Sequence, residues 1–252
     1  MKDLPAESSA ARTVAIVSPV LNEASTVDRL AKSLDYLDPP PDEILLVDGG
    51  STDGGDRRAE ELGLPVLRTE RRGRSRQINA GLAATASEYV CVLHADTELP
   101  FDAVEVIRRV LQDPALSLAS FTPVISGPGG VRWMTTLHNW AKTWYAPLFF
   151  RPDAFIRGGR LLFGDHAMFF RRADFEAVGG FDPTMLVMEE ADFCLKMCRR
   201  GRIRMINRLV LTSDRRLSAW GQWRANWVFL SVGVRWALGR RRELERHYPD
   251  VR

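Results

Sequence analysis

The stretch ILLVDGGSTD, at residues 44–53, contains the pattern that decides the fold. Its four apolar residues, 44–47, form a run without polar alternation, which is typical of a strand covered on both faces and therefore of a parallel sheet. The run ends in Asp48 and a glycine turn, and Asp53 is placed to cap a helix that follows. A strand, a polar turn and a helix in this order predict an α/β sheet.

The same unit is repeated before and after this stretch. Residues 14–17 and 89–93 are two more apolar runs, and residues 203–206 are the last predicted strand. Ser25 opens a helical stripe, with Asp28 completing a Ser-x-x-Asp cap, and a further helix is expected over about residues 75–86. The apolar stripe consists of Val27, Leu30, Ala31, Leu34 and Leu37.

Polar residues stand where three of these strands end. Pro19 and Glu23 follow the first run, Asp48 follows the second, and His94 and Asp96 follow the third. Parallel strands end at a common edge of the sheet, and ligands of such sheets bind beyond that edge. The sequence therefore predicts one site that these side chains share.

Composition excludes several classes of protein. The chain has 252 residues, 45% of them hydrophobic and 27% charged, which excludes collagenous, disordered and disulfide-scaffold proteins. Its cysteines, Cys91, Cys194 and Cys198, form no CxxC pair, so a reducing compartment is expected. Residues 1–12 lack an apolar signal core and no apolar run is long enough to span a bilayer. We therefore expect a cytoplasmic protein, which could also bind peripherally to the inner face of the membrane.

Charge is distributed unevenly along the chain. Residues 199–252 carry a net charge of +10 and residues 1–198 one of −7. A basic tail suits nucleic acid, an anionic membrane, a phosphorylated ligand or simply a solvated face, so charge alone does not choose. The tail also predicts a helix that is apolar on two sides, which would pack on the body and on either a membrane or a second subunit. One side has Trp220, Trp223, Trp227, Leu230, Val234 and Leu238, and the other has Phe229, Val232 and Trp236.

Five motifs together resemble the family 2 glycosyltransferases of GT-A fold. They are PVLNE at 19–23, VDGGSTD at 47–53, NAG at 79–81, GGF at 179–181 and EEAD at 189–192. The stretches GRSRQINAG, HADT, GDH and TSDRR, which begin at residues 73, 94, 164 and 212, are similar to one compact bacterial subgroup associated with radical-SAM and selenium-linked proteins.

The resemblance implies a GT-A domain over residues 13–212, with a mixed, mainly parallel sheet flanked by helices. Residues 1–12 would be a flexible tail, and residues 213–252 a basic, Trp-rich helical extension. The expected activity is transfer of a sugar from a nucleotide diphosphate donor, UDP-linked, to an unidentified acceptor hydroxyl with inversion, and no nucleic-acid partner is expected.

The resemblance also assigns the nucleotide site. Asp48 would accept a hydrogen bond from the uracil imide, and Pro19, Glu23 and Ala95 would frame the nucleoside. The alternative for a carboxylate in such a turn is a helix cap, a role that suits Asp53 better.

The phosphates would be held by basic residues and a divalent ion. Arg74 and Arg76 open a predicted helix, where free N–H groups favour a diphosphate. Asp96 matches the last carboxylate of the family's metal motif, and His94 replaces the first. Imidazole is an acceptable ligand for Mn²⁺ and a poor one for Mg²⁺, so the identity of the metal stays open, and contact of His94 with a phosphate or the ribose is the alternative. Arg215, after the last predicted strand, is a further candidate for the phosphates.

An acidic pair supplies the candidate base. Glu190 matches the family position of the residue that deprotonates the acceptor, and Glu189 is its partner. Acids in the first turn of a helix also have a purely structural explanation, because they complement the helix macrodipole.

Two other functions remain as alternatives. A sugar nucleotidyltransferase would need a glycine-rich phosphate loop after the first strand, where this chain has residues 19–23. A non-catalytic nucleotide-sugar-binding or membrane-associated scaffold would retain the donor site alone, and the departures at His94 and Glu190 keep it open.

Overall fold

The computed structural model describes residues 12–70, 72–239 and 244. The predicted flexible tail at 1–12 therefore lies almost wholly outside the described residues, as do 240–243 and 245–252 of the extension. In chain order, the described elements are β1 (Val14–Val20), α1 (Ala24–Asp35), β2 (Glu43–Asp48), α2 (Gly55–Glu61), β3 (Val66–Arg68), α3 (Arg74–Ala84), β4 (Tyr89–Val92), β5 (Thr97–Glu98), α4 (Ala103–Val110), β6 (Leu116–Gly127), β7 (Gly130–Val131), α5 (Trp133–Phe150), α6 (Pro152–Ile156), the 3₁₀ turn η1 (Gly164–His166), β8 (Met168–Arg171), α7 (Arg172–Ala177), α8 (Glu189–Met197), β9 (Arg202–Ser213), α9 (Arg215–Trp220) and α10 (Gln222–Ala237).

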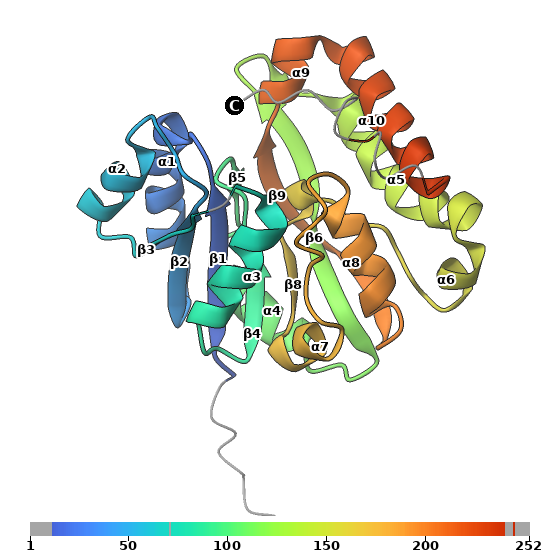
Figure 1. Ribbon diagram of the computed structural model, residues 1–252, viewed down its shortest axis with the longest axis horizontal. Helices are drawn as coiled ribbons and strands as arrows, with labels where there is room; N and C mark the ends of the chain where they lie inside the picture. Colours follow the sequence, from blue (N-terminus) through green and yellow to red (C-terminus); the bar gives the residue numbers. More distant parts are fainter. Residues whose placement is uncertain (1–11, 71, 240–243, 245–252) are drawn as a thin grey trace, which may run out of the picture.

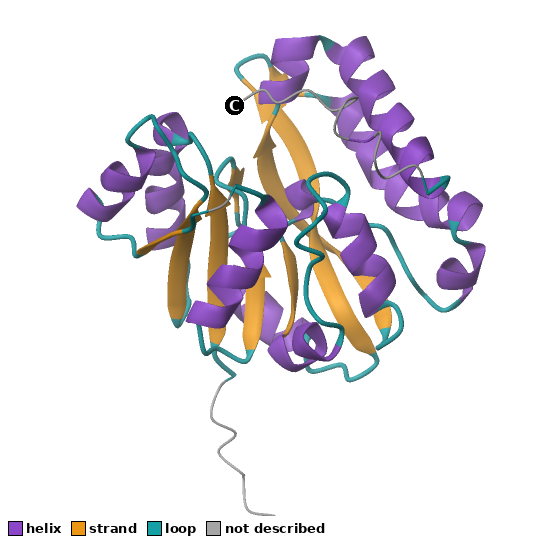
Figure 2. Ribbon diagram, viewed as in Figure 1, coloured by secondary structure: helices purple, strands orange, loops and turns teal. Residues whose placement is uncertain are grey.

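One mixed sheet runs through the molecule (Figures 1 and 2). Its order is β3-β2-β1-β4-β8-β6-β9-β5, with β7 paired to β6. The strands β3, β2, β1 and β4 are parallel, as the apolar runs predicted. Beyond β4 the sheet is mostly antiparallel, because β8 pairs antiparallel with both β4 and β6, and only β6 and β9 are parallel. The predicted mixed α/β fold is confirmed, and the N-terminal strands form its continuous parallel part.

Helices cover both faces of the sheet, which explains the uninterrupted apolar runs. Alternate β1 residues point to opposite sides: Val14 and Ile16 pack with α1 and α4, whereas Val17 packs with α3 and α8. Burial of the apolar side chains on both faces, at about 25 cal/mol per Å² removed from water, is the main stabilising contribution to such a layered core.

Helix α3 is joined to the sheet by two residues of the quoted motifs and to the segment around Phe181 by a third. Gly81 lies against β1 and β2, where a Cβ atom would come within 2.4 Å of Val17, so only glycine permits this approach. The Gln77 amide donates to the carbonyls of Val20 and Val47 at 2.7 Å each and thereby ties the ends of β1 and β2 together. Asn79 exchanges two hydrogen bonds with the Phe181 backbone. The motifs at 79–81 and 179–181 are therefore one structural unit.

Two local predictions are wrong. Helix α1 begins at Ala24, so Ser25 lies inside it and is not the cap. The Asp53 carboxylate takes over capping instead, because it accepts from the N–H groups of Ala24, at 2.8 Å, and Gly55, at 3.0 Å. The last strand is also longer than residues 203–206: β9 continues to Ser213, because its second half pairs with β6 and β5.

The C-terminal extension lies beside α5. Helix α10 packs along α5 at one edge of the molecule, far from α1 and α2 (Figure 1). One predicted apolar side packs on the body, because Val232 and Trp236 are buried, whereas Trp223 and Trp227 of the other side are exposed. Within the described ranges, no helix is long and apolar enough to cross a membrane.

Candidate active site

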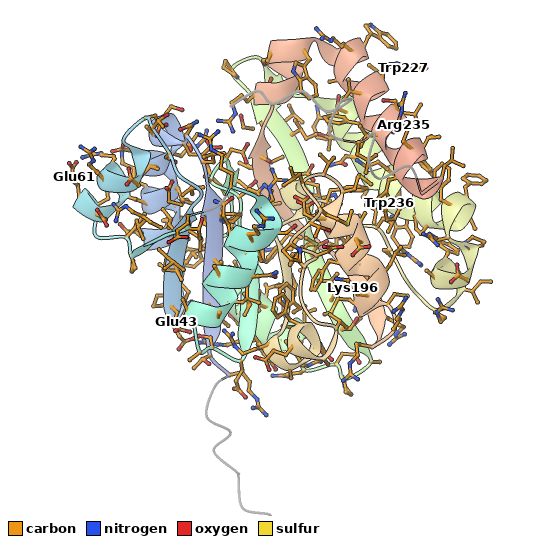
Figure 3. The ribbon with its side chains drawn as sticks, viewed as in Figure 1. Glu43, Glu61, Lys196, Trp227, Arg235 and Trp236 are labelled. Atoms are coloured by element: carbon orange, nitrogen blue, oxygen red, sulfur yellow. The ribbon has the colours of Figure 1, made fainter. Side chains whose placement is uncertain are left out.

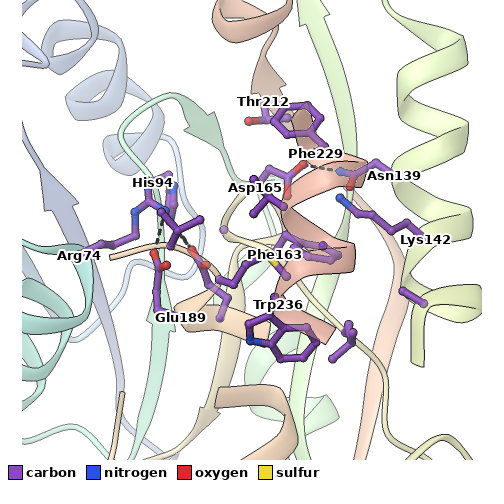
Figure 4. Close-up of a pocket in the computed structure, with 18 of the residues that line it drawn as sticks. Arg74, His94, Asn139, Lys142, Phe163, Asp165, Glu189, Thr212, Phe229 and Trp236 are labelled. Carbon is purple, nitrogen blue, oxygen red and sulfur yellow. Dashed lines mark hydrogen bonds and ion pairs between the residues drawn. The ribbon is translucent and has the colours of Figure 1, made fainter. Parts of the chain in front are cut away.

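A cavity of about 440 Å³ opens beyond the carboxyl ends of the parallel strands. One wall holds Arg74 of α3, His94 and Asp96 after β4, and the acids Glu189 and Glu190 of α8. The opposite wall is made by α5 and α10, and residues 161–165 lie between the two walls. Figure 4 shows Arg74, His94 and Glu189 on one side of this space and Asn139 and Lys142 on the other.

The predicted acidic pair is buried at the start of α8. Glu189 is 1% exposed and Glu190 5%, and the Arg74 guanidinium donates to both, at 2.9 and 3.2 Å. Met188, at the helix N-cap, has a left-handed backbone with φ of 65°, which turns the chain so that both carboxylates enter the site. Arg74, expected on the diphosphate, thus neutralises the acids in this structure.

The fold shifts the pKa of Glu189. Burial raises the pKa of Glu189 to about 7, the negative charge of Glu190 adds to this, and Arg74 opposes it. Near neutral pH, Glu189 is therefore in the range where it holds a proton. A protonated Glu189 lets the two carboxyl groups share one arginine without repelling each other.

The raised pKa of Glu189 makes stability depend on pH. Between its ordinary value of 4.5 and about 7, the folded chain retains a proton that the unfolded chain has released. Its contribution to stability is complete below 4.5 and is lost as pH rises through about 7. Relative to Glu189→Gln, the wild-type free energy of unfolding should therefore fall by at most about 1.4 kcal/mol per pH unit in this window. Urea unfolding of both proteins at pH 5, 6 and 7 measures this, and parallel pH profiles would contradict it.

Gly164 allows the acidic pair and His94 to approach each other. His94 Nε2 lies 3.9 Å from a carboxylate oxygen of Glu190. A Cβ on Gly164 would come within 2.2 Å of the His94 ring and 2.8 Å of that same oxygen, so these two groups occupy the place where a side chain at position 164 would stand. His166 of the same turn is fully buried, and burial lowers its pKa to about 4, so it is neutral.

Asp96 lies at the other end of this wall, beside Arg215. The Arg215 guanidinium donates to both carboxylate oxygens of Glu23, at 2.8 Å each, and lies 3.5 Å from Asp96. Arg215, predicted only to follow the last strand, stands at the start of α9 (Arg215–Trp220). Through Arg215, the C-terminal extension therefore contacts Glu23 and Asp96, two residues that are predicted to bind the nucleotide-sugar donor.

Residues near Asp96 suit a metal that also takes ligands from its substrate. Among the residues that the structure describes, no three His, Cys, Asp or Glu side chains are grouped to hold an ion by themselves. Mg²⁺ at phosphate sites typically uses one or two carboxylates and the substrate phosphates. The Asp96 carboxylate fits that kind of donor set, and the His94 imidazole in the same cavity wall would suit Mn²⁺ rather than Mg²⁺.

The remaining predicted residues lie outside the cavity wall. Asp48 is 3% exposed and accepts from the N–H groups of Gly50, at 2.8 Å, and Ser51, at 3.0 Å, so it shapes the turn after β2. Pro19, at the end of β1, and Ala95, after β4, belong to the strand ends, and Arg76 is half-buried on α3. The structure thus brings together Arg74, His94, Asp96, Glu189 and Glu190 in one wall and leaves Pro19, Glu23, Asp48, Arg76 and Ala95 outside it.

The sequence did not predict the polar residues of the opposite wall. Lys142 lies 3.7 Å from the centroid of the Phe163 ring, and burial lowers its pKa, whereas the negative charges of Asp165 and Glu190 oppose that shift. Asn139 donates to the Asp165 carboxylate. The available signal was the recurrence of polar residues at helical spacing inside the aromatic stretch 133–150.

Comparison with protein families finds a match that covers most of the chain. Residues 15–179, well over half of the chain, match the family described as glycosyl transferase family 2.

Two curated relatives are similar over part of the chain. Glucosyl-3-phosphoglycerate synthase of Mycobacterium tuberculosis is 33% identical over 146 residues, which are 49% of this chain and 45% of the relative. Pre-mycofactocin glycosyltransferase of the same species is 26% identical over 196 residues, which are 75% of this chain and 40% of the relative. The chain thus spans less than half the length of either relative.

Solved structures agree on the fold. A mannosyltransferase of Pyrobaculum calidifontis, determined with GDP-mannose and Mn²⁺, has a TM-score of 0.67 at 20% identity, over 92% of this chain and 64% of its own. The M. tuberculosis synthase, determined with Mn²⁺, UDP-glucose and phosphoglyceric acid, has a TM-score of 0.59 at 19% identity, over 96% and 82%. Both similarities show a shared fold.

Proposed function

Because the chain belongs to glycosyl transferase family 2, we propose that it transfers a sugar, with inversion, from a UDP-linked donor to an acceptor hydroxyl. The observation that carries this proposal is the buried pair Glu189–Glu190, held by Arg74 in the same cavity wall as His94 and Asp96. The proposed base for the acceptor and the proposed ligand of a divalent cation would thus face the same cavity.

Glu190 is the proposed base. Its carboxylate would accept the proton of the acceptor hydroxyl while the anomeric bond to the diphosphate breaks on the other side of the sugar. Glu189, whose pKa is raised by burial to about 7, would be partly protonated at neutral pH, and Arg74 also contacts Glu190, at 3.2 Å. Arg74 would therefore act as the residue that positions the pair.

The donor would lie along the strand ends. Asp48 would bind the uracil imide, with Pro19, Glu23 and Ala95 around the nucleoside and Arg76 towards the diphosphate. Asp96 and His94 would hold a divalent cation, Mn²⁺ or Mg²⁺, which when bound stabilises the negative charge of the leaving diphosphate. The relatives determined with Mn²⁺ and a nucleotide sugar support this choice of donor class.

Hydrolysis of UDP-glucose in the absence of an acceptor tests this function. Transferases commonly leak to water, so we expect slow release of UDP that requires Mn²⁺ or Mg²⁺. A scaffold would bind the donor and leave it intact, and a nucleotidyltransferase would instead form a nucleotide sugar from a sugar phosphate and a nucleoside triphosphate. Donor binding without UDP release under any metal condition would favour the scaffold.

Asp48→Ala should weaken UDP binding by roughly 1–3 kcal/mol, the cost of leaving a buried polar partner unpaired. Asp53→Ala is the matched control, because Asp53 is also a turn carboxylate that accepts from two N–H groups, at 2.8 and 3.0 Å. The control should lose about 1 kcal/mol of stability, as a helix cap does, and keep its affinity for UDP. Isothermal titration calorimetry measures both affinities, and equal affinities in the two variants would remove Asp48 from the site.

The extension at 213–252 would provide peripheral contact with a membrane or with a second copy of the chain. Its exposed tryptophans, Trp223 and Trp227, support contact of one of these kinds.

A further inference from the structure

Helix α5 has its polar side inward and its apolar side outward. It buries Thr135, Thr136, Asn139 and Thr143. Its outer side exposes a stripe at helical spacing that consists of Trp133, Leu137, Trp140, Trp144 and Leu148. Trp133 is 71% exposed and Leu137 64%, so this helix reverses the usual arrangement of a surface helix in water. We therefore expect the apolar stripe to contact an apolar environment outside the protein.

Helix α10 provides a second exposed stripe next to the first. Trp223 is 82% exposed and Trp227 70%, with Leu230 and Leu238 along the same side. Figure 3 shows Trp227 on the outer side of α10, away from the body of the molecule. The two helices contact each other, with Arg151 at the end of α5 placed over the Trp236 ring of α10. We call the outer sides of α5 and α10 together the aromatic face.

The charges around the aromatic face are almost all positive. Residues 133–160 and 222–239 hold six basic side chains and one acid, Asp153, which pairs with Arg157 at 2.8 Å. One of the six, Lys142, lines the cavity instead, which leaves five basic side chains beside this face. In a symmetric dimer the same face of both subunits makes the contact, so the basic residues of one copy would lie opposite those of the other and repel them. An anionic bilayer matches both features, because tryptophan favours the boundary of a bilayer and cations bind its headgroups.

The cavity reaches the aromatic face. Phe150 of α5 and Leu230 of α10 line the cavity and are also exposed, at 37% and 46%. From these residues an apolar wall of Phe163, Val232 and Trp236 continues inward to the acids of α8. A molecule with an apolar chain could therefore keep that chain at the aromatic face while its polar end lies near Glu190.

We propose that the aromatic face docks on an anionic lipid bilayer and that the acceptor is a membrane lipid with a free hydroxyl. The acceptor part rests on the proposed function. The lipid hydroxyl oxygen forms the new bond to the anomeric carbon, the bond from that carbon to the diphosphate breaks, and the diphosphate leaves with the electron pair. The hydroxyl proton passes to the Glu190 carboxylate.

Docking is tested with vesicles of phosphatidylglycerol and phosphatidylcholine, and with vesicles of phosphatidylcholine alone. The wild-type chain should sediment with the anionic vesicles, and the double variant Trp223→Ser/Trp227→Ser should bind at least tenfold more weakly. Leu137→Ser/Trp140→Ser tests the α5 stripe in the same way. Tyr36→Ser is the control, because Tyr36 is 69% exposed at the end of α1, on the other side of the molecule. The proposal would be overturned if the wild-type chain does not sediment with the anionic vesicles. It would also be overturned by a dimer, seen by light scattering, that the same tryptophan variants dissociate.

The acceptor is tested with radiolabelled UDP-glucose and vesicles of a total bacterial lipid extract. Label should enter the organic phase with the wild-type chain and fall at least tenfold with Trp223→Ser/Trp227→Ser. Hydrolysis of UDP-glucose without vesicles should be equal in both proteins, which shows that the variant is folded. Hydrolysis without any label in lipid would overturn the lipid acceptor and leave the proposed function intact. If the wild-type chain neither binds nor hydrolyses UDP-glucose, the proposed function itself is refuted.

Discussion

Glu190→Gln should lower kcat by roughly 10²–10⁴-fold, the usual contribution of a general base, and leave donor affinity unchanged. Glutamine keeps the size of the side chain and an acceptor for Arg74, which donates to Glu190 at 3.2 Å, but it cannot take a proton. Steady-state turnover of UDP-glucose, together with titration of the donor, measures the two quantities separately.

Glu189→Gln is the matched control for this prediction. Glu189 contacts the same arginine, at 2.9 Å, and burial raises its pKa to about 7, so it is partly protonated at neutral pH and an amide imitates that protonated form. Its kcat should therefore fall much less. A larger loss in Glu189→Gln would exchange the roles of the two acids, and a loss in neither would argue against the inverting mechanism.

Asp96→Ala should remove the dependence of donor binding on a divalent cation and lower turnover by about 10²–10³-fold. Charge stabilisation by such an ion contributes several kcal/mol, and each 1.36 kcal/mol corresponds to a factor of ten. Donor titrations with Mn²⁺ and with EDTA, for the wild-type chain and the variant, measure the dependence.

Asp56→Ala is the control for Asp96, because Asp56 is a carboxylate of α2 that pairs with Arg68 at 2.9 Å and lies outside the cavity wall. It should retain the full response to Mn²⁺. If EDTA changes neither binding nor turnover of the wild-type chain, the phosphates must be held by basic residues such as Arg76 and Arg215.

The parallel half of the fold could be predicted from the sequence because its signals are local. Each buried strand is a short apolar run, and burial on both faces leaves no polar alternation, as in β1. The cap of α1 could not be predicted in this way, since Asp53 reaches it from 29 positions further along the chain. The length of β9 likewise depends on pairing with β6.

The candidate site could be predicted only as far as the motifs extend. The acids of α8 and the residues after β4 were recognisable, but the partner of Arg74 depends on the approach of α8 to α3, across 115 positions of sequence. Lys142 and Asn139 were missed because the many aromatic residues of α5 indicate a core helix, whereas its aromatic side is exposed and its polar side lines the cavity.

Thermal unfolding in the presence of nucleotide sugars tests most directly whether the chain binds a nucleotide-diphosphate donor. A ligand at 100 times its Kd stabilises the folded state by about 2.7 kcal/mol, and for a chain of this size that corresponds to a rise in Tm of roughly 5–10 °C. We predict that UDP-glucose or another UDP-sugar gives such a rise with Mn²⁺ or Mg²⁺ and a much smaller one with EDTA. A panel of UDP-, GDP- and other nucleotide sugars that leaves Tm unchanged under every metal condition would contradict the account.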